Sequence, residues 1–365
     1  MFRIAVVLII GSIVGNPAFA SEKKPAAVDA KIIAAYKKLG GEYGTFHWNG
    51  RIGLAEFVPG QTPTDPDDLP GFSFSVLPRE KLPDAGVPFA IDWSSFGPKN
   101  ADFLMLVDLK NLAFLDYIPG NITQAGVSVF ENFENLKWLI TDDQYLSAET
   151  IKQLQRLTVL EHSVQSKEEL SHIAKLPELK HLSLRGDGIN DKGLESLGKL
   201  RNLDVLRLSD CPITGAGFKG FSSLKCLHLD CPAINDDGMK AIGALTALTK
   251  FHLRSKAVTD LGLAELKHLV ALENLDISHT ALTDAGMGVF RHLSRLEIID
   301  LSLTQISEKG LADLKACKAL SSLKIYGVKS TDAGIADVRQ LANLKSLDVR
   351  ATGLSDTKLA ELLSL

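Results

Sequence analysis

The chain has 365 residues, of which 45% are hydrophobic and 23% are charged, a composition typical of a folded protein. Its 40 Lys and Arg residues against 44 Asp and Glu residues give a net charge of −4, so it lacks the basic excess that holds a nucleic-acid backbone. Its four cysteines are too few for a disulfide framework. These counts exclude a dedicated nucleic-acid binder and a disulfide-stapled scaffold.

The first 20 residues have the pattern of a secretory signal peptide. Arg3 supplies a positive charge, residues 4–14 are mostly apolar, and Ala18-Phe19-Ala20 is a small-x-small cleavage site. No later segment has the roughly 18 consecutive apolar residues that a membrane span needs. We therefore predict cleavage after Ala20 and a secreted or periplasmic mature protein without a membrane span. An uncleaved N-terminal anchor is the alternative.

Residues 21–87 differ in pattern from residues 88–365 and are predicted to form an N-terminal cap over them. Residues 28–39 have the pattern of a short amphipathic helix that ends at Gly40-Gly41. Residues 46–54 have the pattern of a hairpin around Asn49-Gly50. Residues 59–88 contain seven of the 14 prolines, which favours a surface loop.

Residues 88–365 repeat with a period of 24. The unit that begins at Leu272 reads Leu-x-x-Leu-x-Ile, followed by Thr283-Asp284-x-Gly286 and further apolar positions. We assign 19 residues to the unit at Leu160 and 21 to the unit at Leu203. About twelve units are in phase, and they begin at Pro88, Leu112, Leu136, Leu160, Leu179, Leu203, Leu224, Leu248, Leu272, Leu296, Leu320 and Leu344.

Each unit predicts a strand followed by a short helix. The alternation of Leu with other residues at period two indicates a strand with one buried face. Eleven positions after the first Leu stands Ser, Thr or Asn, a helix N-cap, and the next residue is usually acidic, which suits the positive end of the helix that it begins. No unit can bury its apolar face alone, so neighbouring units must stack.

The pattern LxxLxLxxTxITDxGLxxLxxL resembles leucine-rich repeats. It is most similar to the strand-plus-helix subclass of cysteine-containing and ribonuclease-inhibitor-like repeats found in secreted bacterial proteins. The resemblance covers residues 88–365. It implies an α/β fold, a right-handed solenoid with parallel strands on its concave side and helices on its convex side. It also implies binding of a protein partner rather than chemistry.

The concave face is predicted to consist of the residues two, four and six positions after each first Leu, because side chains alternate along a strand. In the units at Leu112 to Leu160 these positions are largely apolar, and we favour cover by the Pro-rich segment over an open partner site. From Leu179 onward they carry charge, histidine and serine. The predicted partner-binding residues are Trp138, His181, Arg207, His228, Asp230, His252, Arg254, Asp276, Asp300, Tyr326 and Arg350.

Histidine on this face suggests two kinds of chemistry. Because histidine titrates near pH ~6.5, we expect partner affinity to change between about pH 5.5 and 7.5. Cys226, His228 and His252 could converge on zinc, but they have no regular ligand spacing, so an ordinary polar face is favoured. We predict no metal, no cofactor and no catalytic residue.

Two further motifs have competing interpretations. Gly215-Ala-Gly217-Phe-Lys-Gly220 matches a dinucleotide-binding pattern, but Gly217 stands at the glycine position of the repeat, so a repeat glycine is favoured. Cys211 and Cys231 follow adjacent predicted strands and could form a disulfide. They lie eight and seven positions after their first Leu, however, so one thiol could point inward and the other outward.

The favoured function is a non-enzymatic scaffold that recognises a protein on its concave face. One alternative is the substrate-recognition subunit of an F-box-like ubiquitin ligase, faintly echoed by Leu77-Pro78-Arg79-Glu80. A second is an enzyme with a site on the concave face. The final unit stays in phase to Leu365 without a cap, so we also predict self-association or fraying through that end.

Overall fold

The computed structural model describes residues 26–355 with short gaps. The gaps are 50–53, 66–67, 96, 118–125, 127, 142–145, 147 and 330–337. The predicted signal peptide and the end of the last unit lie outside the described residues. Within the described part of the chain, no helix is both long and apolar enough to cross a membrane.

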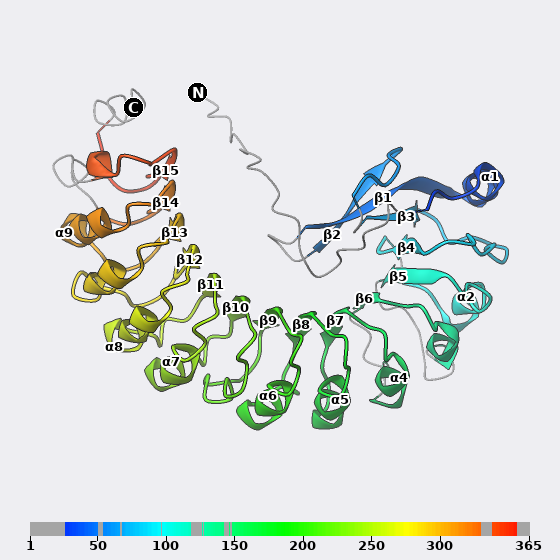
Figure 1. The fold of residues 1–365 in the computed structure, drawn as a ribbon, viewed down its shortest axis with the longest axis horizontal. Coiled ribbons are helices and arrows are strands. Elements are labelled where there is room, and N and C mark those ends of the chain that lie inside the picture. Colours follow the sequence, from blue (N-terminus) through cyan, green and yellow to red (C-terminus); the bar gives the residue numbers. More distant parts are fainter. Residues whose placement is uncertain are drawn as a thin grey trace.

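One curved sheet of 15 strands runs through the described residues, with its strands along the inner side of an arc and helices along the outer side (Figure 1). From β3 (Leu69–Phe74) to β15 (Ser346–Asp348), each strand pairs in parallel with the next one in the chain. The two ends of the sheet do not meet. The predicted α/β solenoid is therefore confirmed.

The strands shorten toward the C-terminal end, and 3-10 helices become more frequent there. The strands between β3 and β15 are β4 (Phe89–Trp93), β5 (Leu112–Tyr117), β6 (Trp138–Thr141), β7 (Val159–Ser163), β8 (His181–Arg185), β9 (Val205–Ser209), β10 (Cys226–Asp230), β11 (Lys250–Leu253), β12 (Asn274–Asp276), β13 (Ile298–Asp300) and β14 (Ser322–Lys324). The helical segments are α2 (Asn100–Phe103), η2 (Ser128–Asn132), α4 (Ala148–Gln153), α5 (Lys167–Ile173), α6 (Asp191–Leu197), α7 (Asp236–Ile242), α8 (Asp260–Leu263), η3 (Ala264–His268), η4 (Met287–His292), α9 (Glu308–Leu311), η5 (Ala312–Ala316) and η7 (Val338–Gln340).

The predicted core residues lie between the strands and the helices. Leu275 pairs with Ile299, which pairs with Leu323, and all three are buried. Asp276, one position after Leu275, is only partly buried and faces the concave side. This alternation confirms the predicted register for these units.

The unit assigned to Leu160 begins three residues earlier. Leu160 pairs with Leu139 and Leu182, which hold the second Leu position of their units, so Leu157 is the first. The interval from Leu136 to Leu157 is 21 residues and the next interval is 22. Both leucines fit the apolar pattern, and only strand pairing distinguishes them. Because a shift of three residues exchanges the two faces of a strand, the outward residues here differ from those predicted.

The unit at Leu203 forms no helix between β9 and β10, although Thr214 holds its predicted N-cap position. Gly215 and Gly220 have φ values of +100° and +95°, which a right-handed helix does not allow. Glycine is also the weakest helix former after proline. In other units the predicted N-caps bind the first turn as expected, for example Asn190 Oδ1 to the Gly193 N–H at 2.9 Å.

Carboxylates on the outer side tie several units to the next one. Asp236 accepts hydrogen bonds from the N–H and hydroxyl of Thr259 at 2.8 and 2.7 Å and from the Gly262 N–H at 3.0 Å. Asp191 and Asp284 bind the following unit in the same way. The acidic residue that the sequence assigns to its own helix thus also holds the N-cap of the next unit.

The N-terminal segment extends the sheet. Helix α1 (Ala30–Lys38) begins at the N-cap Asp29, and β1 (Gly41–Asn49) and β2 (Leu54–Pro59) form an antiparallel pair where the hairpin is predicted. The Pro-rich segment is not only a surface loop, because β3 lies within it and pairs with both β1 and β4. Its Phe72 and Phe74 alternate with Ser73 and are buried, and this burial outweighs the nearby prolines.

Candidate binding site on the concave face

Side chains of the same repeat position form rows across the concave face. The parallel strands pair without offset, so Arg207 lies beside His228 and His228 beside His252. Most of the predicted residues fall into two neighbouring rows. The middle row contains Arg207, His228, His252, Asp276 and Asp300, and the row beside it contains Asp230, Arg254, Tyr326 and Arg350.

The centre of the middle row is a stacked histidine pair. The rings of His228 and His252 lie 3.8 Å apart and within 5° of parallel. Nδ1 of His252 lies 2.8 Å from Oδ2 of Asp276. Burial alone would raise the pKa of Asp276, but hydrogen bonds from His252 and Ser278 lower it to about 2. The carboxylate is therefore ionised at neutral pH and holds the His252 ring in place.

The expected titration of this pair is wrong for His228. Its pKa is lowered to about 3 by burial and by the neighbouring His252 and Arg207. An imidazole with this pKa stays neutral throughout the range from pH 5.5 to 7.5. His228 therefore offers a neutral ring to a partner rather than a charge that changes with pH.

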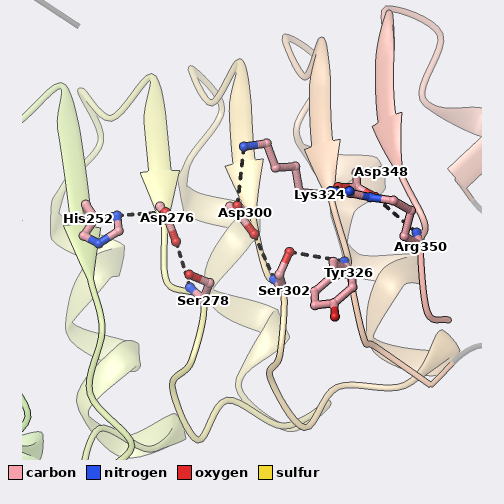
Figure 2. Close-up of polar contacts among 9 residues, drawn as sticks. All are labelled: His252, Asp276, Ser278, Asp300, Ser302, Lys324, Tyr326, Asp348 and Arg350. Carbon is pink, nitrogen blue, oxygen red and sulfur yellow. Dashed lines mark hydrogen bonds and ion pairs between the residues drawn. The ribbon is translucent and has the colours of Figure 1, made fainter. Parts of the chain in front are cut away.

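Carboxylates also organise the C-terminal part of the face (Figure 2). Oδ1 of Asp276 and Oδ1 of Asp300 each accept a hydrogen bond at 3.0 Å from the backbone N–H two residues ahead. Asp348 accepts from the backbone and the guanidinium of Arg350. The acidic groups are thus engaged within the face, while their basic neighbours extend to solvent.

The solvent-facing groups of this part include a tyrosine and an arginine in contact. Tyr326 is 40% exposed, and the Arg350 guanidinium lies 5.8 Å from its ring centre. Lys324 Nζ lies 3.7 Å from Asp300 Oδ2 and is also largely exposed. The result is a firmly held, mixed polar and aromatic surface, and Tyr and Arg are residue types that anchor many protein interfaces.

Two of the predicted binding residues are covered. Trp138 is 2% exposed and His181 is 3% exposed. Trp138 packs on Phe114 with ring centres 5.5 Å apart, and Phe46 of β1 lies on the other end of the same cluster, 5.2 Å from Phe114. Burial also lowers the pKa of His181 to about 3. Neither side chain is presented to a partner.

The cover over the apolar end comes from β1, β2 and β3 together. Phe46 of β1, Phe57 of β2 and Leu69 of β3 pack in one cluster with Phe114 and Trp138. Figure 1 shows the β1–β2 hairpin reaching inward from the N-terminal end of the arc. The Pro-rich segment contributes Leu69, so cover by this segment is confirmed in part, while the hairpin supplies the aromatic residues.

A shallow depression marks the border between the covered and the polar parts. Its lining includes Glu161 of β7, Ser183 of β8 and Arg207 of β9, which are neighbours in the middle row. Burial raises the pKa of Glu161, and the Arg207 cation counteracts this effect. Nε of Arg207 is buried and has no hydrogen-bond partner within the described chain. An acceptor on a ligand would satisfy this donor.

Sequence reasoning misses Glu161 because it begins the unit at Leu160, three residues after the true start at Leu157. The signal that sequence reasoning missed is Leu157, three positions before Leu160, which also fits the first position of the repeat. The same correction places His162 inward, where Nε2 lies 3.0 Å from Oε2 of Glu169. Deeper under the cover, burial together with the carboxylates of Asp92 and Glu161 raises the pKa of Asp116 to about 7.

Metal-ligating atoms converge in the N-terminal segment, not at the histidine pair. Among the described residues, the group with three such atoms within 4.8 Å of one another is His47, Asp65 and Asp68. Its carboxylate Asp68 already binds His47 at 2.5 Å and the N–H groups of Thr64 and Asp65. Hydrogen bonding within the protein accounts for this cluster. The zinc alternative at Cys226, His228 and His252 lacks the required convergence.

The glycine motif serves the repeat. The N–H groups of Gly215 and Gly217 both donate to Oδ1 of Asp191 at 3.1 Å. A Cβ atom at Gly217 would also collide with the backbone of Asp191. The interpretation as a repeat glycine is confirmed, because the donors that a dinucleotide phosphate would need are engaged by a carboxylate.

Comparison with known proteins points to one family. A family model described as leucine-rich repeat matches residues 222–243. No curated protein matches the chain. An internalin structure from Listeria monocytogenes is similar, with a TM-score of 0.50 and 19% identity over 67% of this chain and 82% of the internalin. Internalin C2 from the same organism has a TM-score of 0.42 and 19% identity over 57% of this chain and 84% of its own.

Proposed function

Because this chain is a leucine-rich-repeat protein, we propose that it is a non-enzymatic scaffold that recognises a protein partner on its concave strand face. The observation that carries the proposal is the polar surface from Arg207 to Arg350. Parallel strands present its residues in rows, and internal hydrogen bonds hold the side chains in place. A surface that is already ordered loses little side-chain entropy on binding.

The charge pattern of the face favours a partner of mixed character. The carboxylates of Asp276 and Asp348 are engaged by neighbouring residues. Arg254, Tyr326 and Lys324 are exposed, and Arg207 carries an unused donor. We therefore propose a partner surface that supplies carboxylates or carbonyl oxygens to the basic groups and an apolar group to Tyr326.

A hydrolytic site at the Asp276–His252 pair receives no support from the geometry. The arrangement resembles part of a catalytic triad, in which a base bound to a carboxylate activates a nucleophile. Nε2 of His252 is buried, however, and has no hydrogen-bond partner among the described residues. A nucleophile would have to be within hydrogen-bonding reach of this atom. The pair therefore serves to order the face.

We further propose that the mature protein begins after Ala20 and functions in the periplasm or outside the cell. The support is the sequence pattern of residues 1–20. Residues 21–87 would then form the N-terminal cap of a repeat domain over residues 88–365. We also propose self-association through the unit at Leu344, in which Leu344 and Leu347 are only partly buried.

Crosslinking followed by mutagenesis tests the proposed binding face. The full chain is incubated with secreted or periplasmic proteins of its host, and the crosslinked peptides of any stable complex are identified. Arg254→Glu and Tyr326→Ala should each weaken binding of the identified partner by about 10-fold or more. Lys240→Glu on the outer helix α7 is the matched control and should change the affinity by less than about 2-fold. Crosslinks confined to the helix side would contradict the proposal.

A further inference from the structure

Two cysteines meet in the core near the middle of the solenoid. Cys211 follows β9 and Cys231 follows β10, and these neighbouring strands remain paired to their last residues, Ser209 beside Asp230. The exposed fractions of the two cysteines are 2% and 0%, and both are free thiols in the structure. The two cysteines lie eight and seven positions after the first Leu of their units. Because neighbouring positions along an extended chain point to opposite sides, the burial of both needs an explanation.

The backbone after β9 explains how both thiols point inward. Asp210 adopts a φ of 54°, in the left-handed region that side-chain-bearing residues rarely occupy, and its N–H binds the Asp230 carbonyl at 3.0 Å. This turn directs Cys211 into the core beside Cys231. The expectation that one of the two thiols points outward is therefore wrong.

The two sulfur atoms share one small environment. Sγ of Cys211 lies 3.1 Å from the carbonyl oxygen of Ser209, and Sγ of Cys231 lies 3.4 Å from that of Leu208, the preceding residue. The interaction between the two side chains lowers the pKa of Cys231 and, together with burial, raises the pKa of Cys211. The two side chains are thus close enough to influence each other's ionisation.

We propose that Cys211 and Cys231 become joined by a disulfide bond, with a small-molecule or protein disulfide as the oxidant. During folding, before the core closes over the two cysteines, the thiolate of one of them attacks one sulfur of the oxidant, and the other sulfur of the oxidant leaves as a thiolate. The second cysteine then loses its proton and attacks the sulfur of the first, which expels the remaining thiolate of the oxidant. The two cysteines lose two electrons and two protons, and the oxidant is reduced to two thiols.

The location gives the bond a structural role. The chain between the two cysteines is the unit that lacks a helix, so the outer layer is interrupted there. A groove on the outer side, lined by Phe218, Phe221 and Ala241, marks this interruption. A crosslink between residues 20 positions apart would restrict the unfolded chain and hold β9 against β10 where helix packing is missing.

Thiol counting tests the proposal directly. The full chain is refolded with reduced and oxidised glutathione, denatured without reductant, and its thiols are titrated. Two free thiols are expected instead of four, and a digest should contain a peptide that links Cys211 to Cys231. Reduction should lower the melting temperature of the oxidised protein by a few degrees.

Single serine variants provide the controls. Cys317→Ser removes a thiol elsewhere in the core, so this variant should retain the disulfide and one free thiol. Cys231→Ser should leave three free thiols and remove the effect of reductant on the melting temperature. Four free thiols in the wild-type protein, or a disulfide that involves Cys226 or Cys317, would overturn the proposal whether or not the variants fold.

Discussion

The two ends of this solenoid use the same repeat in different ways. At the N-terminal end, the outward residues Phe114 and Trp138 are buried beneath Phe46 of the hairpin. Toward the C-terminal end, outward residues such as Asp276 and Asp300 remain accessible and bind polar neighbours. A residue on the outward face of a strand is therefore exposed to solvent only where no other segment covers the sheet.

The two regions also differ in the burial of their core residues. The N-terminal core continues into α1 and β1–β3, with Tyr36 stacked on Phe72 at 3.7 Å between ring centres. In the last described unit, Leu344 and Leu347 are only partly buried, whereas Leu323 one unit earlier is fully buried. Leu344 and Leu347 therefore bury less apolar surface than Leu323 does.

The largest expected effect concerns the covered aromatic cluster. Trp138→Ala should lower the free energy of unfolding by about 3–5 kcal/mol, because it removes a buried ring and leaves a cavity. Tyr326→Ala on the exposed face should cost less than about 1 kcal/mol. Urea unfolding followed by circular dichroism measures both. Equal costs would show that the hairpin does not cover Trp138 in solution.

The two regions should respond to pH with opposite signs. The raised pKa of Asp116, about 7 in the folded protein, means that its ionisation opposes folding. Protonated Asp116 contributes its full stabilisation below its ordinary pKa, and this stabilisation is lost as the pH rises through about 7. Asp116→Asn should therefore equal the wild type near pH 4 and exceed it at pH 8, by at most about 4 kcal/mol.

Asp284 provides the matched comparison on the outer side of the C-terminal region. Burial alone raises the pKa of Asp284, but hydrogen bonds from Ser307 and Gly310 lower it overall. Its contribution is present above its ordinary pKa and is lost as the pH falls through the lowered value. Asp284→Asn should be less stable than the wild type at pH 8, with the difference shrinking toward acid pH. Unfolding curves from pH 3 to 8 should give opposite trends for the two variants, and parallel trends would refute the comparison.

A glycine substitution tests the ties between units. A Cβ atom at Gly262 would collide with the Asp236 carboxylate, so Gly262→Ala should cost about 1–3 kcal/mol. Gly288 has no atom within 4 Å of the added Cβ, so Gly288→Ala should be neutral or slightly stabilising. Thermal unfolding of both variants gives the answer. A neutral Gly262→Ala would mean that the carboxylate does not bind the Gly262 N–H.

The smallest effect is local opening at the last described strand. The Ser346 N–H binds the Ser321 carbonyl at 3.0 Å, and the Asn274 N–H binds the Thr249 carbonyl at the same distance. Both amides hold the same repeat position. Hydrogen exchange should be at least about 10-fold faster at Ser346, because Leu344 and Leu347 of its unit are only partly buried. Equal protection in a protein that stays monomeric would remove the support for fraying or self-association at this end.

The part of the fold that could be predicted depends on local periodicity. The inward positions of Leu275 and Leu323 follow from alternation along a strand, and Asn190 as an N-cap follows from its place before a helix. Successive units repeat these short-range signals, so an error in one unit does not change the architecture. The polar rows of the candidate site follow from the same alternation, apart from the unit at Leu157.

Only the tertiary structure decided the features that join distant segments. Phe46 covers Phe114 from 68 positions away, and no local pattern specifies that contact. Strand pairing chose Leu157 over Leu160, because both leucines satisfy the apolar pattern equally. The neutral state of His228 arises from burial and from neighbours on adjacent units. Periodicity assigns a face to each residue, but burial, pairing and charge depend on what packs against that face.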